Sequence, residues 1–179
     1  MSNTITIKAD DLHEVAESLR KNNDTQIKKA KIKNDLFLQA SYTEQFGEEI
    51  NEFDRSSNMP IHPDLRAAFK NIDPHMRSVC EQGEDSATYC TGIIIAKDGE
   101  GVQLIGHRDL AEGGMLNLVS PIIQFGGEYA SSDQGQGFRK AVEAVQNEVM
   151  EYLFHGKFAP KAQMELFPED EKKDDDLPM

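Results

Sequence analysis

The chain has 179 residues and a formal net charge of −13, from 32 acidic and 19 basic side chains. Its hydrophobic fraction of 38%, with no Trp, is enough for one domain with its own core but is lean for a globular protein. A uniformly acidic protein repels phosphate backbones, so a nucleic-acid site must be a local basic patch. Two cysteines, no signal-peptide features and no apolar run of about 20 residues predict a cytoplasmic protein that does not contact membranes.

The N-terminal third alternates between short regular segments and polar connections. Residues 4–8 alternate as a short strand does, and residues 10–21 place apolar side chains at helical spacing behind an Asp N-cap. A strand is predicted over residues 32–42. The acidic and polar segment 44–59 is interpreted as a connection.

Two short helices are expected next. Pro63 suits the first turn of a helix whose apolar positions are Leu65, Ala68, Phe69 and Ile72. Pro74 ends or kinks that helix, and a second helical piece is predicted over about residues 75–82.

The centre of the chain carries the clearest strand signal. Residues 89–97 predict a strand, residues 98–101 have hairpin-turn composition, and residues 102–107 predict the returning strand. A third strand is expected over residues 115–125, where Pro121 marks an edge or a bulge.

The last predicted element is a long amphipathic helix from Phe138 to Leu153, preceded by a loop over 126–137 and closed by Gly156. The predicted fold class is therefore α+β, an antiparallel β-meander packed with two to three helices in one domain over residues 1–158. Residues 159–179 are proline-rich and charged, which predicts a disordered acidic tail. The all-strand pattern of an OB-fold is not found, and the strand order is left open.

The tail ends in an acidic run, two apolar side chains and a free carboxylate: Asp174, Asp175, Asp176, Leu177, Pro178 and Met179. The acids would steer this peptide to a basic surface, and Pro178 lowers the entropy lost on docking. The segment resembles the C-terminal tip of bacterial single-stranded DNA-binding proteins, in which Phe stands where Met179 does. The resemblance implies docking to the replication and repair proteins that bind such tips. The alternative is a merely solvating acidic end.

A second peptide lies upstream, with Gln163, Met164, Glu165, Leu166 and Phe167 in sequence. It is similar to the pentapeptide by which bacterial replication and repair proteins bind the sliding clamp. The similarity implies that Gln163 hydrogen-bonds at a groove entrance while Leu166 and Phe167 enter an apolar pocket. The alternative is that Leu166 and Phe167 fold back on the domain.

Basic residues concentrate between Arg20 and Lys33, where six of them stand against a single acid. Lysines for phosphates beside aromatic rings for bases are the equipment of a single-strand binder, and the candidates are Lys28, Lys29, Lys31, Lys33, Phe37 and Tyr42. On a strand, alternation puts Lys29, Lys31 and Lys33 on one face. The alternatives are that the lysines protect an edge strand and that Phe37 belongs to the core.

Other constellations are weak. The spacing of His62, His75, Cys80 and Cys90 lacks the paired short intervals of zinc sites, so neither a metal nor another cofactor is expected. The triplet from His107 to Asp109 is interpreted as turn surface, and the glycines at 135 and 137 as a helix entry. No catalytic constellation emerges, and the protein is expected not to be an enzyme.

The leading hypothesis is a single-stranded DNA-binding or accessory protein of replication or recombination that recruits partners through its tail. The stretch 92–125 resembles uncharacterised phage-encoded proteins, which implies a phage or mobile-element origin but transfers no residue role. The alternative is an adaptor or decoy without DNA affinity that occupies the sliding clamp or repair proteins, which the acidic body favours. A homo-oligomer is left open.

Overall fold

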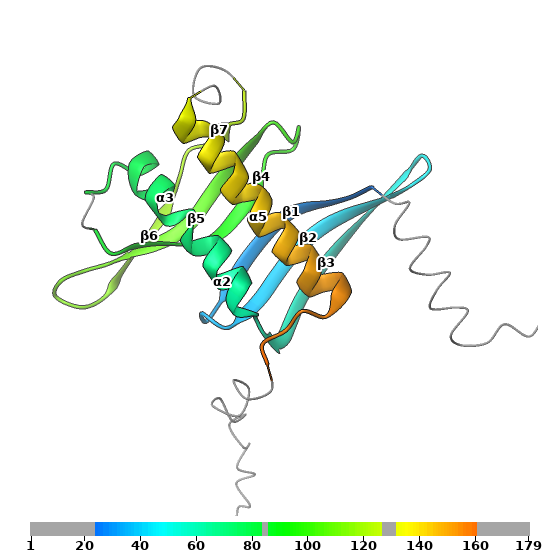
Figure 1. Ribbon diagram of the computed structural model, residues 1–179, viewed down its shortest axis with the longest axis horizontal. Coiled ribbons are helices and arrows are strands. Elements are labelled where there is room, and N and C mark those ends of the chain that lie inside the picture. The colour runs from blue at the N-terminus through cyan, green and yellow to red at the C-terminus, as the bar shows by residue number, and fades with distance from the viewer. Residues whose placement is uncertain (1–23, 84–85, 127–131, 161–179) are drawn as a thin grey trace, which may run out of the picture.

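Three helices lie on one face of a seven-stranded antiparallel sheet, in a computed structural model that describes residues 24–83, 86–126 and 132–160 (Figure 1). The strand order is β3-β2-β1-β4-β5-β6, and β7 pairs with β5. The elements are β1 (Asp24–Lys33), β2 (Phe37–Phe46), β3 (Glu49–Pro60), α2 (Pro63–Lys70), α3 (Asp73–Val79), β4 (Thr88–Ile95), β5 (Gly101–Asp109), β6 (Met115–Val119), β7 (Ile123–Gln124) and α5 (Asp133–His155). In the described parts of the chain, no helix has the length and apolar character needed to cross a membrane.

The strand predicted over residues 32–42 is confirmed from Phe37 onward, where it belongs to β2, but a turn near its start separates off residues 32 and 33, which end β1. Asn34 and Asp35 both have positive φ, 52° and 55°, and the Leu36 N–H donates to the Lys33 carbonyl at 3.1 Å. Two consecutive residues in the left-handed region make a hairpin turn whose twist matches that of the strands, and Asn and Asp tolerate this conformation. The result is the β1–β2 hairpin.

The connection predicted over residues 44–59 is wrong, because most of it is the edge strand β3. Its side chains are nearly all exposed, so no buried alternation marks it in the sequence. The strand is held instead by a continuous antiparallel ladder to β2 that runs from Gln39 opposite Ser56 to Phe46 opposite Glu49.

Most later elements follow the predictions. Helix α2 begins at Pro63, α3 has Pro74 in its first turn, and β4 and β5 pair as the predicted hairpin. The third strand divides around Pro121 into β6 and β7, which pair with successive parts of β5. Helix α5 begins at Asp133, earlier than predicted, because the Ser132 hydroxyl accepts the Gly135 N–H at 3.1 Å and caps it. It ends at Gly156 with φ 65°.

The sheet consists of two consecutive units, each with three strands followed by a helix, and the second unit also includes the short β7. The first contains β1, β2, β3 and α2, and the second contains β4, β5, β6 and α5, with α3 between them. The predicted single meander is therefore two three-stranded meanders, joined where β1 pairs with β4. Their first strands meet antiparallel at the centre, as an approximate two-fold axis requires. The α+β class is as predicted.

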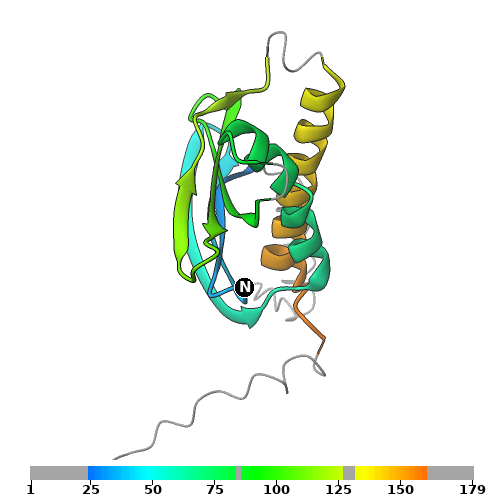
Figure 2. The same cartoon turned by 90° about the vertical axis from the view of Figure 1, so that its left-hand side faces the viewer.

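The core lies between the sheet and the helices, as the edge-on view shows (Figure 2). Its largest fully buried side chains are Leu38, Tyr42, Leu65, Phe69, Ile72, Met76, Ile93, Val102, Leu104, Phe138, Val142 and Tyr152. No described helix covers the opposite face of the sheet (Figure 2). The strand and helix predicted over residues 4–21 and the tail from 161 onward lie outside the described residues.

Candidate nucleic-acid interface

The helix-free face of the sheet carries a row of three lysines on β1. Ala30 and Ile32 point into the core and are 0% and 8% exposed, so the alternating Lys29, Lys31 and Lys33 lie on the opposite face, as their spacing predicts. Strand β1 pairs with β2 on one side and with β4 on the other. Because β1 is central rather than an edge strand, protection of an edge does not account for these lysines.

The cross-strand neighbours of this lysine row are neutral. Ser41, Gln39 and Phe37 stand opposite the three lysines on β2, and Ile94 and Gly92 stand opposite the first two on β4. Within the described ranges, none of the three lysines forms an ion pair. The row is therefore a line of positive charge without ion pairs, although Glu52 lines the same hollow as Lys29 and Asp35 the same hollow as Lys31.

The acids of this face lie to one side of the lysine row. Asp54 on β3 pairs with Ser41 and accepts a hydrogen bond from its hydroxyl. Lys28 sits at a β-bulge between Ile27 and Lys29, and its Nζ donates to Gln26 at 2.9 Å. Lys28 thus lies beside the row without belonging to its alternation.

The two aromatic residues predicted to stack on bases, Phe37 and Tyr42, lie on opposite faces of the sheet. Phe37 pairs with Lys33, points to the helix-free face and is half-buried, so it remains available beside the lysine row. Tyr42 is 2% exposed on the core face, and its ring centroid lies 5.2 Å from those of both Phe53 and Phe154. Because it is buried, Tyr42 cannot stack on a base and is not part of the interface.

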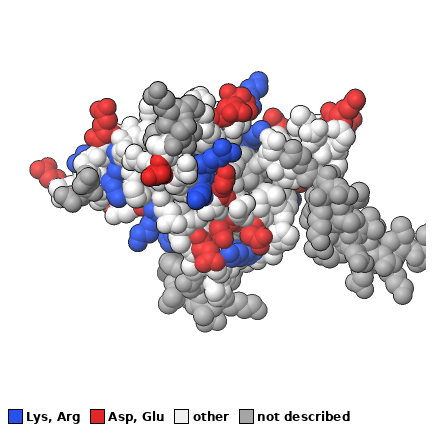
Figure 3. All heavy atoms as spheres, turned by 45° about the horizontal axis from the view of Figure 1, so that its top comes forward, with Lys and Arg blue, Asp and Glu red and all other residues white. Residues whose placement is uncertain are grey.

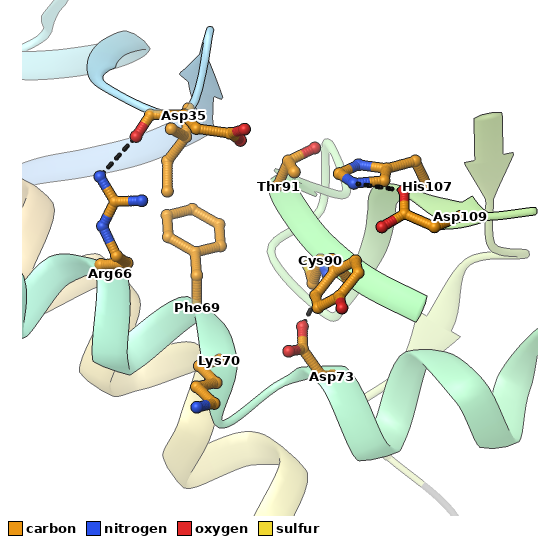
Figure 4. A pocket seen from close by; sticks show the side chains of 11 residues that line it. Asp35, Arg66, Phe69, Lys70, Asp73, Cys90, Thr91, His107 and Asp109 are labelled. Atoms are coloured by element: carbon orange, nitrogen blue, oxygen red, sulfur yellow. Dashed lines mark hydrogen bonds and ion pairs between the residues drawn. The ribbon is translucent and has the colours of Figure 1, made fainter. Parts of the chain in front are cut away.

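A cleft opens where β1 and β4 separate. Their ladder ends at the pair Lys31–Gly92, and β4 has a bulge between Cys90 and Gly92. The Cys90 N–H donates to Asp73 Oδ1 at 2.7 Å, so a carboxylate from α3 satisfies this backbone donor (Figure 4). The sheet is thereby split without leaving the Cys90 donor unpaired.

The cleft has two walls, a floor and a charged rim, and its volume is about 410 Å³. Phe69 lies on one side and Thr91 and His107 lie on the other, with Asp35, Arg66, Lys70, Asp73, Cys90 and Asp109 around them (Figure 4), and Ile32 and Tyr89 complete the lining. A second hollow of about 460 Å³ shares Ile32, Asp35, Thr91 and His107 with it and continues past Lys31 to Met115 and Val119 on β6. The two hollows form one groove, which we call the β1–β4 groove.

Two rings and one buried carboxylate define the chemistry of the groove. The Tyr89 and His107 ring centroids lie 5.4 Å apart, and Tyr89 is 43% exposed. The His107 Nε2 lies 3.7 Å from Asp109 Oδ1. Asp73 is only 7% exposed, and its burial raises its pKa despite the hydrogen bond from the Cys90 N–H.

Several of these residues were not found from the sequence. The triplet interpreted as turn surface lies within β5: His107 faces the groove, whereas Arg108 donates to Gln82 at 2.9 Å. Tyr89 was assigned only to a strand, and Asp73 follows a helix end with no motif around it. Alternation along the predicted strand 89–97 was the sequence signal that could have placed the Tyr89 side chain on the exposed face.

The remaining predicted residues give no competing site. The peptides Gln163–Phe167 and Asp174–Met179 lie outside the described residues. On the side that Figure 3 shows, acidic and basic side chains are interspersed. Across the described ranges, no three His, Cys, Asp or Glu side chains come together as metal ligands. Compared with known proteins, the chain matches no family model, no curated protein and no solved structure.

Proposed function

We propose that this protein binds single-stranded DNA across the helix-free face of its sheet, as an accessory protein of replication or recombination. The observation that carries the proposal is the row Lys29, Lys31 and Lys33, which is unpaired with described acids on a central strand. A soluble domain gains nothing for its own stability from three aligned like charges, since they repel each other. A phosphate backbone would relieve that repulsion.

The geometry favours a single strand over a duplex. Alternate residues of a strand lie about 6.7 Å apart, which matches the spacing of phosphates along an extended single strand. Phe37 and Tyr89 expose ring surface beside the row, and unpaired bases stack on such rings whatever their sequence. A duplex would present its phosphates to the lysines but would hide the faces of its bases.

The experiment is fluorescence anisotropy with labelled oligo-dT and with a duplex of the same length. The test variant is Lys31→Gln/Lys33→Gln, and the matched control is Arg139→Gln/Lys140→Gln, which removes two exposed charges from α5. Loss of two phosphate contacts should reduce the slope of log K against log salt by about 1.4, while the control keeps the wild-type slope. Absence of binding at micromolar protein and low salt, or equal effects of the two variants, would remove the proposal.

The tail supports the accessory role. We propose that Asp174–Met179 docks to proteins that bind single-strand-binder tips and that Gln163, Leu166 and Phe167 dock to a sliding clamp. The net charge of −13 also favours a second function, an adaptor or decoy that uses these peptides without binding DNA. Pull-downs with the intact chain, with Leu177–Met179 deleted, and with Gln163→Ala/Phe167→Ala test both. Identical partners for all three chains would refute the role of the tail.

A further inference from the structure

The cleft between β1 and β4 has the shape and polarity of a site for one nucleobase. We propose that it binds bases with an exocyclic amino group in preference to thymine or uracil, and that Asp73 makes the choice. The inference rests on the proposed single-strand binding, which it extends from an unspecific surface to a base-selective site. Its support comes from the walls, the floor and the rim of the cleft.

The walls suit a flat aromatic ring. Tyr89 and His107 present rings from β4 and β5 on one side, and the largely buried Ile32 and Phe69, which are 8% and 2% exposed, close the other side. Aromatic and aliphatic side chains on both sides of a slot are the surroundings that an unstacked base needs. The cleft volume of about 410 Å³ is within the range of small-molecule sites, which begins at about 300 Å³.

The floor supplies an acceptor with spare capacity. Asp73 Oδ1 accepts the Cys90 N–H, and no other described residue donates a hydrogen bond to this carboxylate. An ionised carboxylate only accepts, so it pairs with an amino group and is repelled by a carbonyl oxygen. Cytosine, adenine and guanine carry such an amino group, whereas thymine and uracil present carbonyl oxygens on both sides of a single N–H.

A carboxylate in the first turn of α3 is favoured by the helix dipole, but the hydrogen bond to Cys90 does not need a charged acceptor. An Asn side chain would accept the same Cys90 N–H, and it would do so without burying a charge. Burial raises the pKa of Asp73, and the Cys90 N–H, Arg77 and Lys70 offset only part of the cost of burying the charge. A ligand amino group would offset that cost.

The rim carries two cations that can face the phosphate of the same nucleotide, beside the carboxylates of Asp35 and Asp109. Arg66 and Lys70 lie on the exposed side of α2 at the cleft entrance (Figure 4). The Arg66 guanidinium donates one hydrogen bond to the Asp35 carbonyl, which leaves its other donors free for a phosphate. Lys31, the middle lysine of the row, lines the continuing part of the groove.

The test compares oligo-dC with oligo-dU of equal length at neutral pH, because the two bases have the same size and differ mainly in the amino or carbonyl group at C4. We expect the wild-type chain to bind oligo-dC about tenfold more tightly. Asp73→Asn keeps the acceptor for Cys90 and adds a donor, so the preference should vanish or reverse. Asp133→Asn, an exposed acid in the first turn of α5 that lines neither hollow, is the matched control and should keep the preference.

The outcomes separate this inference from the proposed function. Equal affinities for the two oligonucleotides, or a preference that Asp73→Asn leaves unchanged, would overturn the base-selective cleft and leave single-strand binding in place. If neither oligonucleotide binds, the proposed function fails, and titration with dCMP and dUMP decides about the cleft. Shifts of the Tyr89 ring resonances with dCMP alone would support the cleft, and no shift with either nucleotide would overturn it.

Discussion

Replacing Gly106 with Ala should destabilise the protein strongly, because this glycine sets how closely α3 and β4 approach β5. Gly106 stands opposite Cys90 in the β4–β5 ladder. A Cβ at this position would lie 2.0 Å from the Tyr89 carbonyl oxygen and 2.7 Å from Met76 Sδ. Met76 could rotate away, but the Tyr89 oxygen belongs to the backbone, so the strand itself must move. Overpacking of this kind costs about 1–3 kcal/mol, and we expect a value near the upper end.

The assay is urea unfolding followed by circular dichroism, with Gly137→Ala as the matched control. Gly137 lies in α5, its φ is not positive, and nothing lies within 4 Å of an added Cβ. The same chemical change should there raise the free energy of unfolding by about 0.5–1 kcal/mol, because Ala favours a helix. A Gly106→Ala chain as stable as wild type would refute the close approach of Tyr89 to β5. The position of Tyr89 in the wall of the β1–β4 cleft would then not depend on the glycine at position 106.

Two further predictions concern the anchoring of the C-terminal end of α5. Tyr152→Phe should lower the free energy of unfolding by about 1–2 kcal/mol, because the buried hydroxyl bonds to the Met59 carbonyl and ties α5 to β3; equal urea midpoints would contradict this. Lys157→Met removes contacts of 2.8 Å to both Asp64 and Glu148. The hydrogen bond from Lys157 lowers the pKa of Asp64, so this stabilisation is present above the ordinary Asp value of 3.8 and is lost as the pH falls through the folded pKa. The urea midpoints of the two chains should therefore differ at neutral pH and converge in acid.

The sequence was sufficient for elements whose signal is local. The helix beginning at Pro63, the β4–β5 hairpin and the break at Pro121 each depend on a proline or a turn within a few residues. The turn at Asn34 and Asp35 was also local, but the apolar residues on both sides of it looked like one continuous strand. Positive φ at two successive residues is the feature that apolar patterning alone does not reveal.

The candidate site shows the same division. The lysine row follows from alternation within one strand, and the same alternation places Tyr42 in phase with the buried Leu38 and Ala40, so its burial was readable. The cleft was not readable, because its residues come from β1, α2, α3, β4 and β5. They meet only because β1 pairs with β4, and that pairing joins segments about 60 residues apart in the chain. No local pattern encodes it.

In the proposed complex, the acidic charge of the chain and its basic row would make opposite contributions to DNA affinity, and the dependence on salt separates them. The excess negative charge repels a strand over long distances, and this repulsion is screened once the Debye length falls to about 10 Å, near 0.1 M salt. Direct contacts of the three lysines with phosphates act at short range. They make log K fall as log salt concentration rises, with a slope of about −2. The slope should therefore be shallow at low salt, where added salt also relieves the repulsion, and should steepen toward −2 above about 0.1 M. A constant steep slope from low salt upward would mean that the acids lie too far from the bound strand to act on it.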